Sequence, residues 1–201
     1  LFDDIDQIVK NTAIRSFANL PDVFTHHLSY FGFGDKSAFF RPVQSLTLMS
    51  DHFLWGLEPF GYHITNTLLH ILVSILLFYA AFIVTKDRLV SAIGSLLYLV
   101  HPVHTEAVTY VSGRADSISS VFLLLMIIFA SRCWSAGKSA RIFYYGLVMA
   151  SFLLGLLSKE SAVIFPFLLV FFEYCAKDKD GYDKLTARKA LFYLPLFVIM
   201  A

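Results

Sequence analysis

Two adjacent carboxylates, Asp3 and Asp4, stand near the start of the sequence in the run Phe2-Asp3-Asp4-Ile5. Neighbouring acids repel each other when both are ionised, so the pKa of one is raised, and such a group can act as a general base. The same pair is also typical of a solvated acidic turn. The residue types alone leave both the catalytic and the structural interpretation open.

A second polar stretch lies between two apolar runs and comprises His101-Pro102-Val103-His104-Thr105-Glu106 and Gly113-Arg114-Ala115-Asp116. Ionisable side chains between membrane-length apolar runs are usually paired or functional, because burying a charge there is costly. His101, His104 and Glu106 have poor metal-ligand spacing without a third histidine nearby, so we predict no metal site. Two interpretations remain. Arg114 forms a structural network with Asp116 or Glu106, or it clamps the phosphate of an anionic head group.

Further cations and polar groups follow the same logic. In Ser158-Lys159-Glu160-Ser161, Ser158 can cap the next helix and Glu160 can favour its first turn, whereas Lys159 is the only basic residue of that turn. Arg41 lies in Phe40-Arg41-Pro42, ahead of a polar stripe. The members of that stripe recur at helical spacing and favour interhelical hydrogen bonds inside a bundle. They are His63, Asn66, His70 and Ser74.

The elements that must position these residues are membrane helices. The sequence is 57% hydrophobic and 15% charged, with a mean hydropathy of +0.67, which exceeds the apolar content of ordinary soluble domains. We predict an all-α, polytopic bundle over 62–201 with about six spans, preceded by a non-cytoplasmic loop, 1–61, with interfacial juxtamembrane helices. The predicted spans are 62–84, 89–100, 118–130, 142–157, 162–172 and 190–201. Both ends of the sequence look internal, so we expect a longer polypeptide.

The basic residues sort into alternate connections. Because Lys and Arg resist translocation, the connections that hold most of them are expected in the cytoplasm. The basic residues of these connections are Lys86, Arg88, Arg132, Lys138, Arg141, Lys177, Lys179, Lys184, Arg188 and Lys189. The acidic pair, the stretch 101–117 and Lys159 then share the opposite face. A net charge of +1 gives no basic field for nucleic acid, so membrane lipids, and no nucleic acid, are the expected surroundings.

With these residues in view, the chain resembles the transmembrane-and-TPR-containing protein O-mannosyltransferases and their bacterial relatives, of the GT-C class. The resemblance rests on four segments: Phe2-Asp3-Asp4 with Ile8 and Asn11, then 40–70, then 101–117, then 158–161. It implies a GT-C-like helix bundle that transfers a sugar, mannose above all, from a polyprenyl or dolichyl phosphate to an acceptor hydroxyl. The partners would be this lipid-linked donor and a protein or glycan acceptor, with protein Ser or Thr among the candidates.

The resemblance also implies roles for single residues. Asp3 would be the catalytic base, with Asp4 as the second choice. Arg114 would be the first phosphate ligand, with Arg41, Lys159 and His101 behind it. The remaining substrate-binding candidates are His104, Glu106 and Asp116. No cofactor is required, although a divalent cation is compatible with the reaction.

The resemblance further predicts inversion at the anomeric carbon, TPR repeats beyond residue 201, and a location in the bacterial plasma membrane or, in a eukaryote, the endoplasmic reticulum membrane. The alternative function is a transporter or channel whose pathway is lined by His63, His70, His101 and Arg114. A third interpretation is a non-catalytic membrane scaffold.

Overall fold

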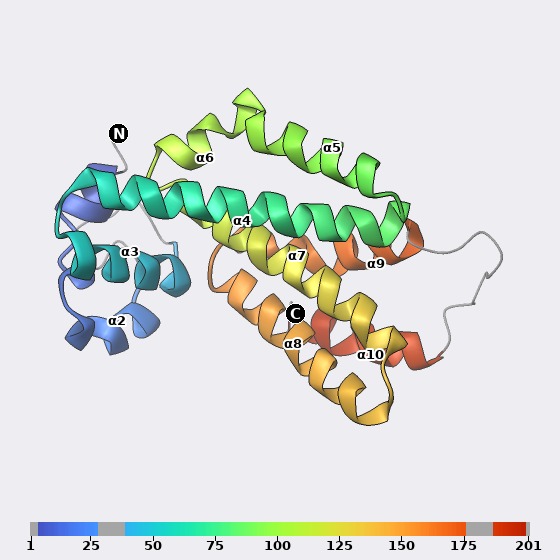
Figure 1. The fold of residues 1–201 in the computed structure, drawn as a ribbon. Coiled ribbons are helices and arrows are strands. Elements are labelled where there is room, and N and C mark those ends of the chain that lie inside the picture. The colour runs from blue at the N-terminus through green and yellow to red at the C-terminus, as the bar shows by residue number, and fades with distance from the viewer. Residues whose placement is uncertain (1–3, 28–38, 176–186, 200–201) are drawn as a thin grey trace.

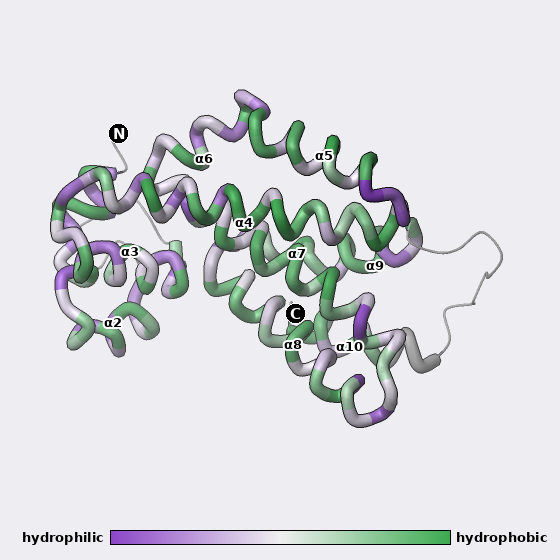
Figure 2. The backbone as a smooth tube through the Cα atoms, in the orientation of Figure 1, coloured by the Kyte–Doolittle hydropathy of each residue, from purple (hydrophilic) through white to green (hydrophobic). Residues whose placement is uncertain are grey.

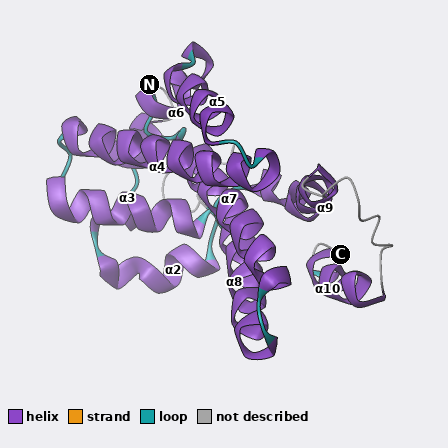
Figure 3. Cartoon of the chain, turned by 45° about the vertical axis from the view of Figure 1, so that its right-hand side comes forward, coloured by secondary structure: helices purple, strands orange, loops and turns teal. Residues whose placement is uncertain are grey.

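The chain is a bundle of helices in the computed structural model, which describes residues 4–27, 39–175 and 187–199. Within these residues every regular element is helical (Figure 3), as the sequence predicts. The main helices are α2 (Leu20–Thr25), α3 (Pro42–Trp55), α4 (Pro59–Thr85), α5 (Arg88–Val100), α6 (Thr105–Thr109), α7 (Arg114–Ser135), α8 (Lys138–Leu156), α9 (Phe165–Cys175) and α10 (Ala187–Val198). Short helical turns are η1 (Ile5–Val9), η2 (Ala13–Arg15), η3 (Phe17–Asn19), η5 (Pro102–His104) and η6 (Glu160–Ile164).

Among the described residues, three helices are long and apolar enough to cross a membrane, namely α4, α7 and α8. They contain the first, third and fourth predicted spans. The second predicted span forms α5, whose 13 residues reach only about 20 Å at 1.5 Å per residue, short of a hydrocarbon core of about 30 Å. The fifth lies across η6 and α9, and the last lies largely in α10, with residues 200 and 201 outside the described residues.

Local signals end α4 and reverse the chain into α5. Lys86 adopts a left-handed conformation with φ +56°, and its N–H donates to Phe82 O, which closes the C-terminus of α4. Asp87 then caps α5, since its Oδ1 accepts from the backbone N–H groups of Leu89 at 2.7 Å and Val90 at 3.2 Å. The two helices therefore lie antiparallel and side by side (Figure 1).

The main core fills the space among α4, α7, α8, α9 and α10. Met126, Val148, Phe152 and Leu169 are fully buried in it. The outer surface of the bundle stays apolar, because only 22% of the most apolar window of α4 is buried inside the protein. Figure 2 shows this continuous apolar stretch along α4 and the hydrophilic turn after it. An exposed apolar surface of this extent is suited to lipid.

A second, smaller core ties the N-terminal region to the bundle. Ile8, Ile14, Leu48 and Met49 pack together with Tyr62, which belongs to the first turns of α4. The region that the sequence presents as a loop is therefore packed on the bundle through α3 and α4. Its outer side carries large exposed side chains, among them Phe53, Leu54 and Phe60.

The connections gather at two ends of the bundle. One end holds the starts of α4, α7 and η6 and the ends of α5 and α8, and the other holds the α4–α5 and α7–α8 turns (Figure 1). This arrangement places the α4–α5 and α7–α8 turns, with their basic residues, at the end away from the polar motifs, whereas the third predicted basic connection lies largely outside the described residues. Which end faces the cytoplasm stays a prediction.

Candidate functional site

The four polar segments, scattered over about 160 residues of sequence, meet at one end of the bundle. Ser112 N–H donates to Asp4 Oδ1 at 2.8 Å, and Arg41 pairs with Glu160 across 119 positions of sequence. Lys159 pairs with Asp116 at the same end. Each of these contacts joins residues of two different segments, so the segments form one continuous polar surface.

The acidic segment is held in place by hydrogen bonds. Asp4 is half-buried, and its bond to Ser112 places the carboxylate against the loop that leads into α7. Gln44 is fully buried on α3, and its amide donates to Gln7 Oε1 at 3.0 Å and to Ser112 O at 3.1 Å. Gln44 thus links η1 to the same loop. Asp3, the first predicted catalytic residue, lies outside the described residues.

Arg114 forms the buried junction of three helices. Its guanidinium has no exposed surface and pairs with Asp51 Oδ2 of α3 at 2.6 Å. It also donates to Asn66 Oδ1 at 2.9 Å and to Tyr62 O at 3.1 Å, both on α4, and to Thr47 Oγ1 at 3.3 Å. Several acceptors and one carboxylate offset the cost of burying this charge. These bonds give Arg114 a structural role that joins α7 to α3 and α4.

The ionic partners differ from the network that the sequence suggests for Arg114. Asp116 pairs with Lys159 instead, and the acidic partner of Arg114 is Asp51. In this arrangement the guanidinium of Arg114 does not reach the surface where a lipid phosphate would lie. The cations at that surface are Arg41 and Lys159, with side chains 13% and 25% exposed.

Arg41 and Glu160 form a bidentate ion pair. Arg41 Nε donates to Glu160 Oε1 at 3.0 Å and Nη2 donates to Oε2 at 2.7 Å. Partial burial acts to raise the pKa of Glu160, but the hydrogen bonds from Arg41 and the charge of Lys159 outweigh it and lower this pKa below its usual value. The carboxylate is therefore ionised at neutral pH and lies between two cations.

A polar cavity of about 360 Å³ opens beside this surface, between α5, α6 and the start of α7. Tyr98, His104, Glu106, Asp116 and Ser117 are among its lining residues. Its volume lies within the roughly 300 to 1,000 Å³ of small-molecule sites, and carboxylate and hydroxyl groups of this kind can bind the hydroxyls of a sugar. The substrate candidates His104, Glu106 and Asp116 thus share one cavity.

His104, which lines this cavity, lies close to two other rings. The ring of His104 lies 4.1 Å from that of Tyr98 and 5.6 Å from that of His70, measured between centroids. Desolvation, with His70 and His101 as further causes, lowers the pKa of His104 below its ordinary value. His101 is exposed, and its Nδ1 accepts from the N–H of Val103 at the start of η5. His104 is therefore neutral at pH 7, and His101 also has a local capping role.

Side chains of the polar stripe on α4 form interhelical hydrogen bonds, as predicted. Asn66 Nδ2 donates to Tyr110 O at 2.9 Å and His70 Nε2 lies 3.1 Å from Leu99 O. Ser74 Oγ donates to Ser95 O at 2.8 Å. These three members of the stripe are buried, while His63 is half-buried. The stripe holds α5 and α6 against α4.

Comparison with curated proteins gives relatives across most of the chain. Mouse protein O-mannosyl-transferase TMTC3 is 34% identical over 167 residues, which covers 81% of this chain and 18% of the relative. Human TMTC1 is 31% identical over 190 residues, with 89% and 22% covered, and Drosophila melanogaster Tmtc3 is 32% identical over 203 residues, with 86% and 22% covered. The chain is a homologue of the TMTC proteins.

The chain spans about a fifth of the length of these TMTC relatives. No known family profile matches it. No solved structure matches it either. The relation to the TMTC proteins thus rests on sequence identity.

Sequence reasoning missed two residues that organise this candidate site. Asp51 and Gln44 lie in the region 1–61, for which the sequence predicts a loop with interfacial helices, and α3 places both at the junction with α7. A signal was present, because Gln44, Thr47 and Asp51 stand at i, i+3 and i+7 and so share one helix face. A carboxylate on a helix face that packs against a bundle indicates a buried cationic partner.

The arrangement can support acid–base and anion-binding chemistry. It combines a fixed carboxylate, Asp4, with two cations at the surface, Arg41 and Lys159, and a polar cavity next to them. Among the residues that the structure describes, no group of three or more His, Cys, Asp or Glu side chains is placed to hold a metal ion.

Proposed function

We propose that this chain is the active-site region of a membrane glycosyltransferase that transfers mannose from a polyprenyl or dolichyl phosphate to a Ser or Thr hydroxyl of a protein. The single observation that carries the proposal is the meeting of the four polar segments at one end of the bundle. The printed names of the TMTC relatives, protein O-mannosyl-transferases, support the reaction class. The apolar spans support a donor that is itself anchored in the membrane.

Asp3 is the proposed base, and Asp4 supports it. One oxygen of Asp4 already accepts the N–H of Ser112, so this residue fixes the acidic segment against the loop before α7. Asp3 would take the proton of the acceptor hydroxyl as its oxygen attacks the anomeric carbon. A C–O bond forms on one face of the sugar while the C–O bond to the phosphate breaks on the other, which inverts the configuration.

Arg41 and Lys159 are the proposed ligands of the departing phosphate. Both are present as ion pairs whose carboxylate partners, Glu160 and Asp116, are 46% and 58% exposed, so water can solvate these carboxylates when a phosphate takes their place. Two fixed positive charges stabilise the negative charge that develops on the leaving group. Arg114 has a positioning role, because its hydrogen bonds and ion pair hold α3, α4 and α7 together behind this surface.

The cavity beside these cations would receive the sugar. Glu106 and Asp116 offer carboxylate acceptors, and neutral His104 offers one donor and one acceptor. The site would face away from the cytoplasm, in the endoplasmic reticulum membrane of a eukaryote or the plasma membrane of a bacterium, because the basic connections lie at the other end.

The test measures mannose transfer from dolichyl phosphate mannose to an acceptor protein by the full-length protein in membranes. We expect Asp3→Asn together with Asp4→Asn to lower kcat by at least about 100-fold, the usual contribution of a positioned general base. Asp6→Asn is the matched control, because Asp6 lies in the same segment and pairs only locally with Lys10.

Unchanged transfer by the double variant would refute the proposed base. Solute transport by the purified protein in liposomes, with no glycosyl transfer, would instead support the transporter interpretation.

A further inference from the structure

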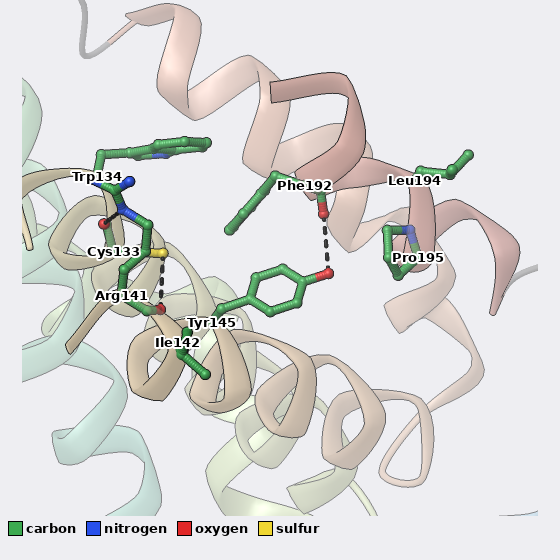
Figure 4. A pocket seen from close by; sticks show the side chains of 8 residues that line it. All are labelled: Cys133, Trp134, Arg141, Ile142, Tyr145, Phe192, Leu194 and Pro195. Carbon is green, nitrogen blue, oxygen red and sulfur yellow. Dashed lines mark hydrogen bonds between the residues drawn. The ribbon is translucent and has the colours of Figure 1, made fainter. Parts of the chain in front are cut away.

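A second cavity lies at the end of the bundle opposite the candidate site. It has a volume of about 440 Å³ and opens between the α7–α8 turn and α10 (Figure 4). This volume is within the range of small-molecule sites. The cavity does not overlap the polar surface described above, so it requires its own explanation.

Its walls are apolar. Trp134 and Tyr145 contact Phe192, with ring centroids 4.8 Å and 5.0 Å apart, and Ile142 and Leu194 continue the lining toward the outside. The polar atoms of the aromatic walls are already used, since Tyr145 Oη donates to Phe192 O at 3.4 Å and Trp134 Nε1 donates to Glu173 Oε1 at 2.7 Å. Ordered water needs polar partners, so a hydrocarbon occupant is favoured.

Among the residues that the structure describes, Arg141 is the charged side chain of the cavity lining. Arg141 Nε donates to Cys133 O at 3.3 Å and Nη2 donates to Ala136 O at 3.1 Å, which fixes the guanidinium at the turn between α7 and α8. A guanidinium has five N–H groups, and these two bonds use two of them. Arg141 is half-buried, and Lys138 lies exposed one turn before it on α8. Arg141 thus places a positive charge at this apolar cavity.

The location adds a second constraint. The cavity lies at the end of two membrane-length helices, α7 and α8, where a bilayer changes from hydrocarbon to head groups. Ile142 and Phe143 are 75% and 64% exposed there, as expected for side chains that face lipid. Basic pockets between membrane helices favour anionic head groups.

We propose that this cavity binds an anionic phospholipid, with an acyl chain along Trp134, Tyr145 and Leu194 and the phosphate on Arg141. Guanidinium groups bind phosphate through paired N–H donors, which accounts for an Arg at this position. The lipid would fasten α10 to the α7–α8 hairpin at the face opposite the candidate site. The inference needs the membrane spans but not the glycosyl transfer.

The test uses native mass spectrometry of the full-length protein, released from nanodiscs that contain equal amounts of phosphatidylserine and phosphatidylcholine. We expect the wild-type protein to retain phosphatidylserine preferentially. Arg141→Gln should reduce that preference about fivefold, which corresponds to the roughly 1 kcal/mol of one basic side chain at an anionic surface. Arg141→Lys should retain more of it, and Leu194→Trp, which fills the cavity without a change of charge, should reduce retention of both lipids.

Arg88→Gln is the matched control, because Arg88 is an exposed cation at the same end of the bundle but begins α5, away from the cavity. An equal loss in Arg88→Gln and Arg141→Gln would show general surface attraction and overturn the proposal. A wild-type protein without lipid preference would also overturn it. This is the result expected if another segment of the longer polypeptide occupies the cavity. Retention that is unchanged by Leu194→Trp would also overturn it.

Discussion

The ion pair of Arg114 and Asp51 offers the sharpest test of how the site is built. Asp51→Asn keeps the size of the side chain. It also keeps an oxygen that can accept the hydrogen bond from Thr65 Oγ1, which lies 2.7 Å from Asp51 Oδ1 in the structure. It removes the negative charge beside a guanidinium with no exposed surface. Loss of one partner of a buried pair costs about 3 to 5 kcal/mol, because the other charge stays buried without compensation.

The assay is chemical unfolding of the purified protein in detergent, in a double-mutant cycle. We expect Asp51→Asn and Arg114→Met each to lower the free energy of unfolding by about 3 to 5 kcal/mol. The double variant should lose about 2 to 3 kcal/mol less than the sum, since neither charge is then left alone. Asp116→Asn is the control. Its side chain is 58% exposed in its pair with Lys159, and its effect should stay below about 1 kcal/mol.

A different result would separate the two interpretations of Arg114. If Arg114 bound the donor phosphate directly, its replacement would raise the KM for the donor and leave the free energy of unfolding unchanged. That outcome, or strictly additive single effects, would refute the buried junction.

Three further predictions follow from other contacts. Lys159→Gln and Arg41→Gln should each raise the KM for the lipid-linked donor about tenfold, the effect of about 1.4 kcal/mol, with little loss of folded protein on size-exclusion chromatography; an unchanged KM in both would exclude them as phosphate ligands. Because the pKa of His104 is lowered in the folded protein, the unfolded chain binds the proton first as the pH falls below about 6.5, so stability should drop there. His104→Phe should flatten this part of a plot of melting temperature against pH, and an unaltered slope would contradict the assignment. Gly155→Ala should cost about 1 to 3 kcal/mol, because a Cβ would lie 2.5 Å from Phe165 Cε2, whereas Gly146→Ala on the same helix has open space and should be neutral in thermal unfolding; equal effects would argue against the close packing of α8 on α9.

Hydropathy was enough to predict the long helices, because a membrane-length apolar run has few structural alternatives. It located α4 within a few residues, since Pro59 and the Lys86–Asp87 turn bound the run on both sides. The polar stripe that contains Asn66, His70 and Ser74 was also predictable, because helical spacing alone puts these polar groups on one face.

The pairing of charges was not predictable in the same way. Arg114 was matched with acids near it in sequence, Glu106 and Asp116, but its partner in the structure is Asp51, 63 positions earlier. Which carboxylate a buried cation meets depends on how helices pack, and the shared helix face of Gln44, Thr47 and Asp51 does not say which cation lies opposite it. The sequence predicts interfacial helices within the region 1–61 but not their bounds, so it does not predict how α3 packs against α4 and α7.

The ion pair between Arg41 and Glu160 also has a consequence for biosynthesis. At about 5 to 20 residues per second, the ribosome needs roughly 6 to 24 s to add the 119 residues that separate the two partners. The hydrogen bond from Val43 N–H to Leu157 O, 3.2 Å long, likewise forms only after Leu157 has been translated. Segment 39–58 is thus translated, and its helix can form, well before its partners leave the ribosome, and the polar surface is completed only after α7 and α8 have entered the membrane. A nascent chain that stalls before α8 would carry the acidic segment and Arg41, but not Lys159 or Glu160.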